Sequence, residues 1–228
     1  MILVPANPDG VYNAFDRSEP MSLTNILNQL KYGTPVIIVS GLPRSGTSMM
    51  MKMLSAGGLE IVSDGERGAD VDNPEGYFEY ERVKDLDKPK DAGWVVETRG
   101  KVLKVISFLL RHLPSTCRYK IIFMRREIDE VIASQNKMLV NRGEPVDPDS
   151  DAVTRKDLEA HLQRVEQLFG MRSNFEVLQV AHRDVIENPL DQARIINRFL
   201  GGRLDVEKMA SVVDPELYRT KAVKVSPD

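Results

Sequence analysis

Short apolar runs alternate along this chain with longer segments in which apolar residues recur every three or four positions. The continuous runs are typical of strands buried on both faces, and they predict strands at 36–39, 102–106, 119–124 and 175–181. The periodic segments predict amphipathic helices at 23–31, 47–55, 80–86, 128–139, 158–169 and 191–200, with one further short helix in the tail. Because strands and helices alternate, the fold class is α/β with a parallel sheet and helices on both faces.

Two polar segments interrupt this pattern. Residues 59–78 are rich in Gly, Asp, Glu and Asn, and 141–150 reads NRGEPVDPDS, so both predict loops. We interpret 141–150 as an internal loop and the whole chain, 1–228, as a single domain, because 228 residues fall within the range of one α/β domain.

The charge balance restricts the kind of partner. The chain has 31 Lys and Arg against 34 Asp and Glu, a formal net charge of −3. Nucleic-acid binding favours a basic domain or stripe, so we expect no nucleic-acid partner. This balance is compatible with a local pocket for one small anion.

The cysteine content, the N-terminal pattern and the hydropathy indicate whether the protein binds a metal, is secreted or enters a membrane. Cys117 is the one cysteine, and the three histidines are scattered, so no zinc-ligand spacing is present and we expect no metal site. The N-terminus lacks the pattern of a signal peptide, and no apolar run approaches the ~20 residues that span a bilayer. We therefore expect a cytoplasmic protein without membrane insertion.

The most informative stretch is VIIVSGLPRSGTS, residues 36–48, which predicts a strand, a glycine-containing turn and the start of a helix. Gly41 and Gly46 have the spacing of a phosphate-binding P-loop, in which backbone N–H groups and a helix N-terminus surround an anion. Thr47 stands where a nucleoside-triphosphate loop has lysine, and the cation of this loop is Arg44. We find no apolar strand ending in a convincing aspartate ligand for Mg²⁺. The loop therefore fits a phosphosulfate, whose transferred group carries one negative charge, better than a triphosphate.

The segment PRSGTS, Pro43 to Ser48, resembles the 5′-phosphosulfate loop of the sulfotransferases that use 3′-phosphoadenosine-5′-phosphosulfate (PAPS). The second signature of that family is a strand followed by arginine and, eight residues later, serine for the 3′-phosphate. Arg126 and Ser134 have this spacing after the strand 119–124, and Arg125, one residue off, is our second choice.

Three further stretches are similar to the bacterial branch of this family: NPEGYFE at 73–79, KVLKV at 101–105 and DPELYR at 214–219. The likeness extends over roughly residues 35 to 221 and does not cover the N-terminal extension and first helix, 1–34. It implies a P-loop NTPase-like, three-layer α/β/α fold with a central parallel sheet.

The resemblance also implies roles for single residues. Lys104 would stabilise charge on the leaving phosphate, although a lysine at a strand end is often simply solvated. The general base would be Glu66 or Glu79, because Ile106 stands where other members have histidine and His112 is better explained as a helix-face residue. Thr47 and Ser48 could instead cap the helix that follows. The residues implied to contact the cofactor are Pro43, Arg44, Ser45, Gly46, Thr47, Ser48, Arg126 (or Arg125), Ser134, Arg219 and Lys221.

The implied activity is metal-independent, in-line transfer of a sulfonate group from PAPS to a hydroxyl or amine, with 3′-phosphoadenosine-5′-phosphate (PAP) as the product. We expect a small-molecule or glycan acceptor. Two alternatives from other classes stay open. One is a nucleotide kinase or NTPase with a degenerate P-loop, and the other is a non-catalytic protein that binds PAP.

Overall fold

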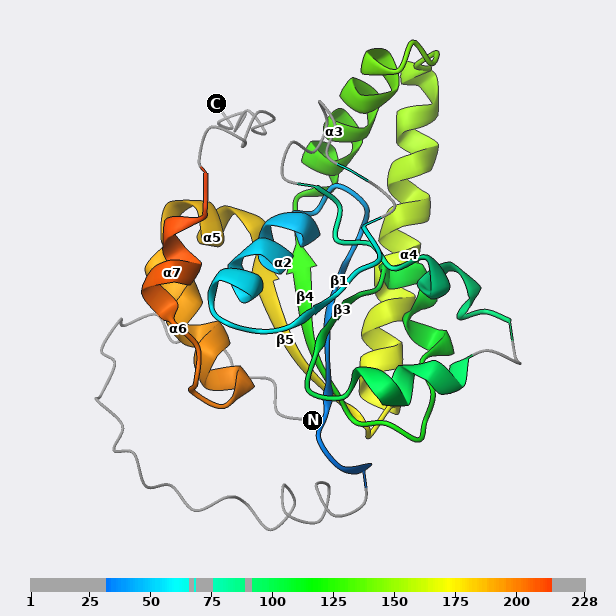
Figure 1. Ribbon diagram of the computed structural model, residues 1–228. Helices are drawn as coiled ribbons and strands as arrows, with labels where there is room; N and C mark the ends of the chain where they lie inside the picture. The colour runs from blue at the N-terminus through cyan, green and yellow to red at the C-terminus, as the bar shows by residue number, and fades with distance from the viewer. Residues whose placement is uncertain (1–31, 66–67, 69–75, 89–91, 215–228) are drawn as a thin grey trace.

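The core of the protein is a five-stranded sheet, seen in a computed structural model that describes residues 32–65, 68, 76–88 and 92–214 (Figure 1). Every strand pairs in parallel, in the spatial order β2-β3-β1-β4-β5. The strands are β1 (Val36–Gly41), β2 (Ile61–Val62), β3 (Val102–Lys104), β4 (Tyr119–Arg125) and β5 (Phe175–Ala181). The predicted parallel α/β class is therefore confirmed.

Helices cover both faces of this sheet (Figure 1). The α-helices are α2 (Thr47–Ala56), α3 (Ile128–Asn141), α4 (Asp151–Met171), α5 (His182–Glu187), α6 (Pro189–Leu200) and α7 (Val206–Ser211). Short 3₁₀ turns make up η1 (Glu81–Asp85), η2 (Ala92–Thr98), η3 (Ser107–His112) and η4 (Pro148–Ser150). In the part of the chain that the structure describes, no helix has the length and apolar character needed to cross a membrane.

The alternation of side chains along β1 explains the three layers. Val36 and Ile38 belong to a buried cluster that includes Val165 of α4, whereas Val39 belongs to a second cluster with Met50 of α2. Successive residues of a strand point to opposite faces, so a continuous apolar run places a core on each side. Burying one such side chain contributes about 1.5–3 kcal/mol.

The structure corrects several predicted boundaries. The strand predicted at 102–106 ends at Lys104, because the chain turns into η3 three residues later, at Ser107. The loop predicted at 59–78 contains β2, a two-residue edge strand too short to give a periodic signal. The turn η2 and the short helix α5 were not predicted. The helix predicted at 23–31 lies outside the described residues.

The position of β1 determines where a ligand can bind. Because all strands are parallel, their carboxyl ends meet at one edge of the sheet, where open α/β folds bind ligands. β1 lies between β3 and β4, so the loop from β1 to α2 is bordered by the ends of both neighbours.

Candidate functional site

The loop between β1 and α2 has an unusual backbone. Gly46 occupies the N-cap of α2 with φ 93°, and Arg44 has φ 68°, a left-handed conformation that is uncommon for a residue with a side chain. Because Gly46 is the N-cap, neither Thr47 nor Ser48 is the capping residue of α2 that the alternative expected. The first N–H groups of a helix have no intrahelical partners, and they give this loop the donors that an anion requires.

Both loop glycines lie where a larger residue would not fit. A Cβ added to Gly46 would collide with the His182 ring of α5, and one added to Gly41 would lie 2.8 Å from the carbonyl oxygen of Met124 and collide with Ser45. The Ser45 hydroxyl is itself buried and, within the described structure, has no hydrogen-bond partner. The loop is thus a close-fitting cradle with a buried polar atom beside it.

The two phosphate motifs predicted from the sequence lie in direct contact. Arg44 Nε donates a hydrogen bond to Ser134 Oγ at 3.1 Å, and Arg126 Nη1 donates to the carbonyl oxygen of Arg44 at 2.9 Å. Arg126 and Ser134 are both nearly buried, at 8% and 9% exposure. Arg125, the second choice, instead forms an ion pair with Glu166 of α4 at 3.1 Å. The structure therefore brings Arg126, and not Arg125, against the loop.

Three residues that the sequence analysis missed lie beside Arg126. Glu130 is 3% exposed and accepts hydrogen bonds from Arg126 Nε at 3.1 Å and from Arg183 Nη2 at 3.2 Å. Burial lowers the pKa of His182 to about 4, with a further decrease from Arg126 and an opposing effect of Glu130. The i,i+4 spacing of Arg126 and Glu130 is a detectable signal for this ion pair. His182 and Arg183 could have been found only as polar residues directly after a predicted strand.

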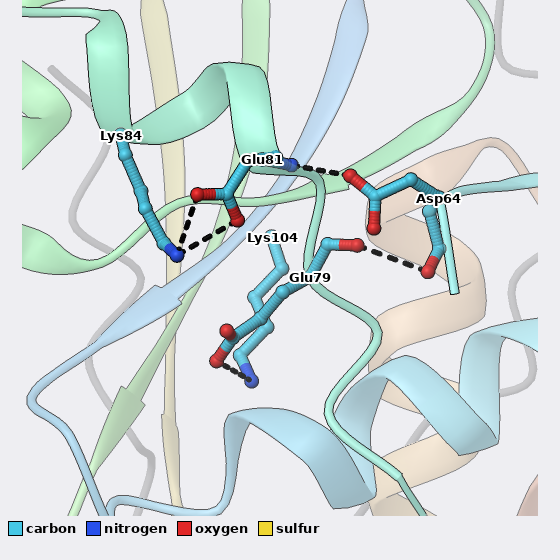
Figure 2. Close-up of polar contacts among 6 residues, drawn as sticks. Asp64, Glu79, Glu81, Lys84 and Lys104 are labelled. Atoms are coloured by element: carbon cyan, nitrogen blue, oxygen red, sulfur yellow. Dashed lines mark hydrogen bonds and ion pairs between the residues drawn. The ribbon is translucent and has the colours of Figure 1, made fainter. Parts of the chain in front are cut away.

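A second group of polar residues lies at the end of β3 (Figure 2). Lys104 Nζ donates to the Tyr77 carbonyl oxygen at 2.7 Å and to Ser48 Oγ at 3.2 Å, and it is 3.9 Å from Glu79 Oε1. The Lys104 side chain is 9% exposed, so it is not a solvated lysine at a strand end. Its contacts connect the start of α2 to the segment that carries Glu79.

Hydrogen bonds after β2 hold that segment in place (Figure 2). Ser63 Oγ donates to the Glu79 carbonyl oxygen at 3.0 Å, and the Glu81 N–H donates to Asp64 Oδ2 at 2.5 Å. Phe78 has φ 50°, a strained value for an aromatic residue. The Glu79 carboxylate, 30% exposed, is thereby held close to both Lys104 and solvent.

The structure also locates the remaining candidates. Ile106 is 41% exposed, and His112 is a half-buried residue of η3, as expected for a helix-face position. Pro43 is an exposed residue of the loop. Glu66, Arg219 and Lys221 lie outside the described residues. Within the described ranges, no group of three or more His, Cys, Asp or Glu side chains is arranged to hold a metal ion.

Comparison with known proteins gives the same fold. A family model described as a sulfotransferase domain matches residues 34–221. The sulfotransferase domain of the Synechococcus PCC 7002 olefin synthase aligns with 16% identity and a TM-score of 0.50 over 86% of this chain and 91% of that one. The sulfotransferase STF1 of Mycobacterium tuberculosis H37Rv aligns with 14% identity and a TM-score of 0.48 over 78% and 71%. No curated protein matches the chain. The predicted P-loop-like fold is confirmed by the first of these structures.

Proposed function

This chain belongs to the sulfotransferase domain family, and we propose that it transfers a sulfonate group from PAPS to a hydroxyl or amine acceptor. The observation that carries the proposal is the contact of Arg44 with Ser134 and with Arg126. The loop that carries Arg44 is suited to a 5′-phosphosulfate, and the motif of Arg126 and Ser134 is suited to a 3′-phosphate. Their contact means that one nucleotide carrying both groups could reach them together.

The residues of this site fit the phosphate groups of PAPS. The positive-φ turn at Arg44 and Gly46, the N-terminus of α2 and the buried Ser45 hydroxyl offer hydrogen-bond donors to a phosphosulfate. Arg126 and Ser134 would hold the 3′-phosphate, since a guanidinium matches a phosphate in geometry and in charge. When bound, PAPS supplies an activated sulfonate whose leaving group is a phosphate.

Lys104 would stabilise the charge that develops on that phosphate. Its ammonium is held at the start of α2 by Ser48 and by the Tyr77 carbonyl oxygen. A preorganised cation in a site with little water stabilises a developing anion more strongly than the same cation in solvent. Together with Arg44, Lys104 gives the loop the positive charge that the proposed metal-independent transfer needs.

Glu79 would act as the general base that removes the proton from the acceptor. Its carboxylate lies 3.9 Å from Lys104, at the loop side of the sheet edge, and is accessible to a substrate entering from solvent. General-base catalysis requires a carboxylate within hydrogen-bond reach of the acceptor proton. Glu66 is the alternative base and lies outside the described residues. The acceptor that we propose is a small molecule or a glycan.

A thermal-shift titration tests the nucleotide site. We expect PAP without Mg²⁺ to raise the melting temperature by about 5–10 °C at a concentration near 100 times Kd. The variants R44A and R126A should lose most of this shift. R125A is the matched control, because Arg125 pairs with Glu166 and not with the loop, and it should retain the shift. Stabilisation by Mg²⁺–ATP alone would instead support the degenerate kinase.

Transfer is tested separately with ³⁵S-labelled PAPS and a panel of phenols, alcohols and amino sugars. We expect at least one acceptor class to become labelled. A protein that binds PAP tightly but labels no member of the panel, and whose nucleotide affinity is the same in E79Q, would support the non-catalytic binding protein.

A further inference from the structure

A buried carboxylate connects two arginines beside the phosphate loop. Glu130, on the first turn of α3, is 3% exposed. Its Oε2 accepts from Arg126 Nε at 3.1 Å, and its Oε1 accepts from Arg183 Nη2 at 3.2 Å. The cluster therefore joins α3, the end of β4 and the start of α5 through a single side chain.

Because Glu130 is buried, its carboxylate depends on these two partners. A carboxylate removed from water is tolerated only when it is paired and hydrogen-bonded. Both oxygens of Glu130 are engaged by guanidinium groups. Arg126 lies two residues before α3 and Glu130 on its first turn, and their side chains meet in this ion pair.

The ion pair determines the orientation of the Arg126 guanidinium. The Nε atom of its guanidinium is held by Glu130, and Nη1 is held by the carbonyl oxygen of Arg44 in the loop. A planar guanidinium held at two of its nitrogens has one orientation relative to the loop. Ser134, on the same helix and in contact with Arg44, lies on the loop side of this arrangement.

We propose that Glu130 is a positioning residue, which orients Arg126 for the 3′-phosphate of the nucleotide. This inference rests on the proposed function. Glu130 does not touch the nucleotide and acts through Arg126. Arg183 holds the second carboxylate oxygen and so keeps Glu130 itself in place.

Positioning and simple charge balance predict opposite results. Replacing Glu130 by glutamine removes a negative charge near the site, so Coulomb attraction alone would strengthen the binding of a phosphate dianion. If Glu130 orients Arg126, the same substitution weakens binding, because the guanidinium loses a charged hydrogen-bond partner. The sign of the change therefore separates the two roles.

The experiment is isothermal titration of wild type and E130Q with PAP and with AMP, which lacks the 3′-phosphate. We expect E130Q to bind PAP about 10- to 100-fold more weakly, the effect of one hydrogen bond to a charged group, and to bind AMP as wild type does. In the R126A background E130Q should cause no further loss, because a positioning residue acts through its partner. E166Q, which removes the exposed partner of the neighbouring Arg125, is the matched control and should bind both nucleotides normally.

Two further variants keep the proposal testable if E130Q folds poorly. E130D retains the charge and shortens the reach, and R183Q releases one carboxylate oxygen from a partly exposed partner. Both should weaken PAP binding with less effect on AMP. Wild-type affinity for PAP in these variants, or tighter binding by E130Q, overturns the positioning role and leaves the sulfotransferase proposal intact. Failure of wild-type protein to bind PAP overturns both.

Discussion

Arg44 and Ser134, ninety positions apart in sequence, are joined by a hydrogen bond of 3.1 Å from Arg44 Nε to Ser134 Oγ. The bond ties the loop that follows β1 to the helix that follows β4. These two strands are neighbours in the sheet, so the contact follows directly from the strand order. It places one residue of each predicted phosphate motif at the same point.

Loss of this hydroxyl should weaken nucleotide binding selectively. S134A removes the acceptor of Arg44 and the proposed ligand of the 3′-phosphate, so we expect about tenfold weaker binding of PAP. Affinity for AMP should change less. Titration of both nucleotides measures this difference, with S55A, an exposed serine of α2, as the control. Equal losses for PAP and AMP would contradict the assignment of Ser134 to the 3′-phosphate.

Gly46 should tolerate substitution poorly. An alanine there must adopt φ 93° and its Cβ must displace His182, so we expect G46A to lower the free energy of unfolding by about 2–5 kcal/mol. G58A has the same kind of positive φ but open space around its Cβ, and it should cost only about 1–2 kcal/mol. Urea denaturation of both variants gives the comparison. Equal costs would mean that the contact with His182 is unimportant.

The loop and the second motif that contacts it could be recognised in the sequence because their signals are local. The spacing of Gly41 and Gly46 defines a turn, and the eight residues from Arg126 to Ser134 run from the end of β4 into α3. The contacts of Glu130 with Arg183 and of Gly46 with His182 could not be predicted, because they depend on where β5 lies in the sheet. The strand order depends on how the segments pack together, so it cannot be predicted from residue spacing within one segment.

The choice between Arg125 and Arg126 illustrates the same limit. Both residues follow the apolar run of β4. The family's spacing of eight residues to the serine favours Arg126 over Arg125 by a single position. The structure separates them by contact, with Arg125 directed to Glu166 of α4 and Arg126 to the loop. Neighbouring residues at a strand end point to opposite sides, so only one of the two can reach the loop.

Glu79 should affect turnover more than binding. If its carboxylate is the general base, E79Q should lower kcat by about 10²- to 10⁴-fold and change the KM for PAPS little. E81Q is a close control, because Glu81 lies two residues away and pairs with the exposed Lys84 (Figure 2). Steady-state transfer of ³⁵S from PAPS to an acceptor found in the panel measures both constants. Wild-type kcat in E79Q would leave Glu66 as the proposed base.

The buried imidazole of His182 should make the protein less stable in mild acid. Its pKa is lowered to about 4 in the folded state from 6.5, so below pH 6.5 the unfolded chain binds a proton that the folded chain does not. The contribution of His182 to the free energy of unfolding has its full value above pH 6.5. It decreases by about 3 kcal/mol in total as the pH falls towards 4.

The variant H182Q cannot take up this proton, so it isolates the contribution of His182 from that of other titrating groups. We expect the difference in unfolding free energy between wild type and H182Q to shift by about 2 kcal/mol against wild type between pH 7 and pH 5. Urea denaturation at both pH values measures it. A difference that does not change with pH would mean that the imidazole beside Arg126 and Glu130 is protonated equally in the folded and unfolded states.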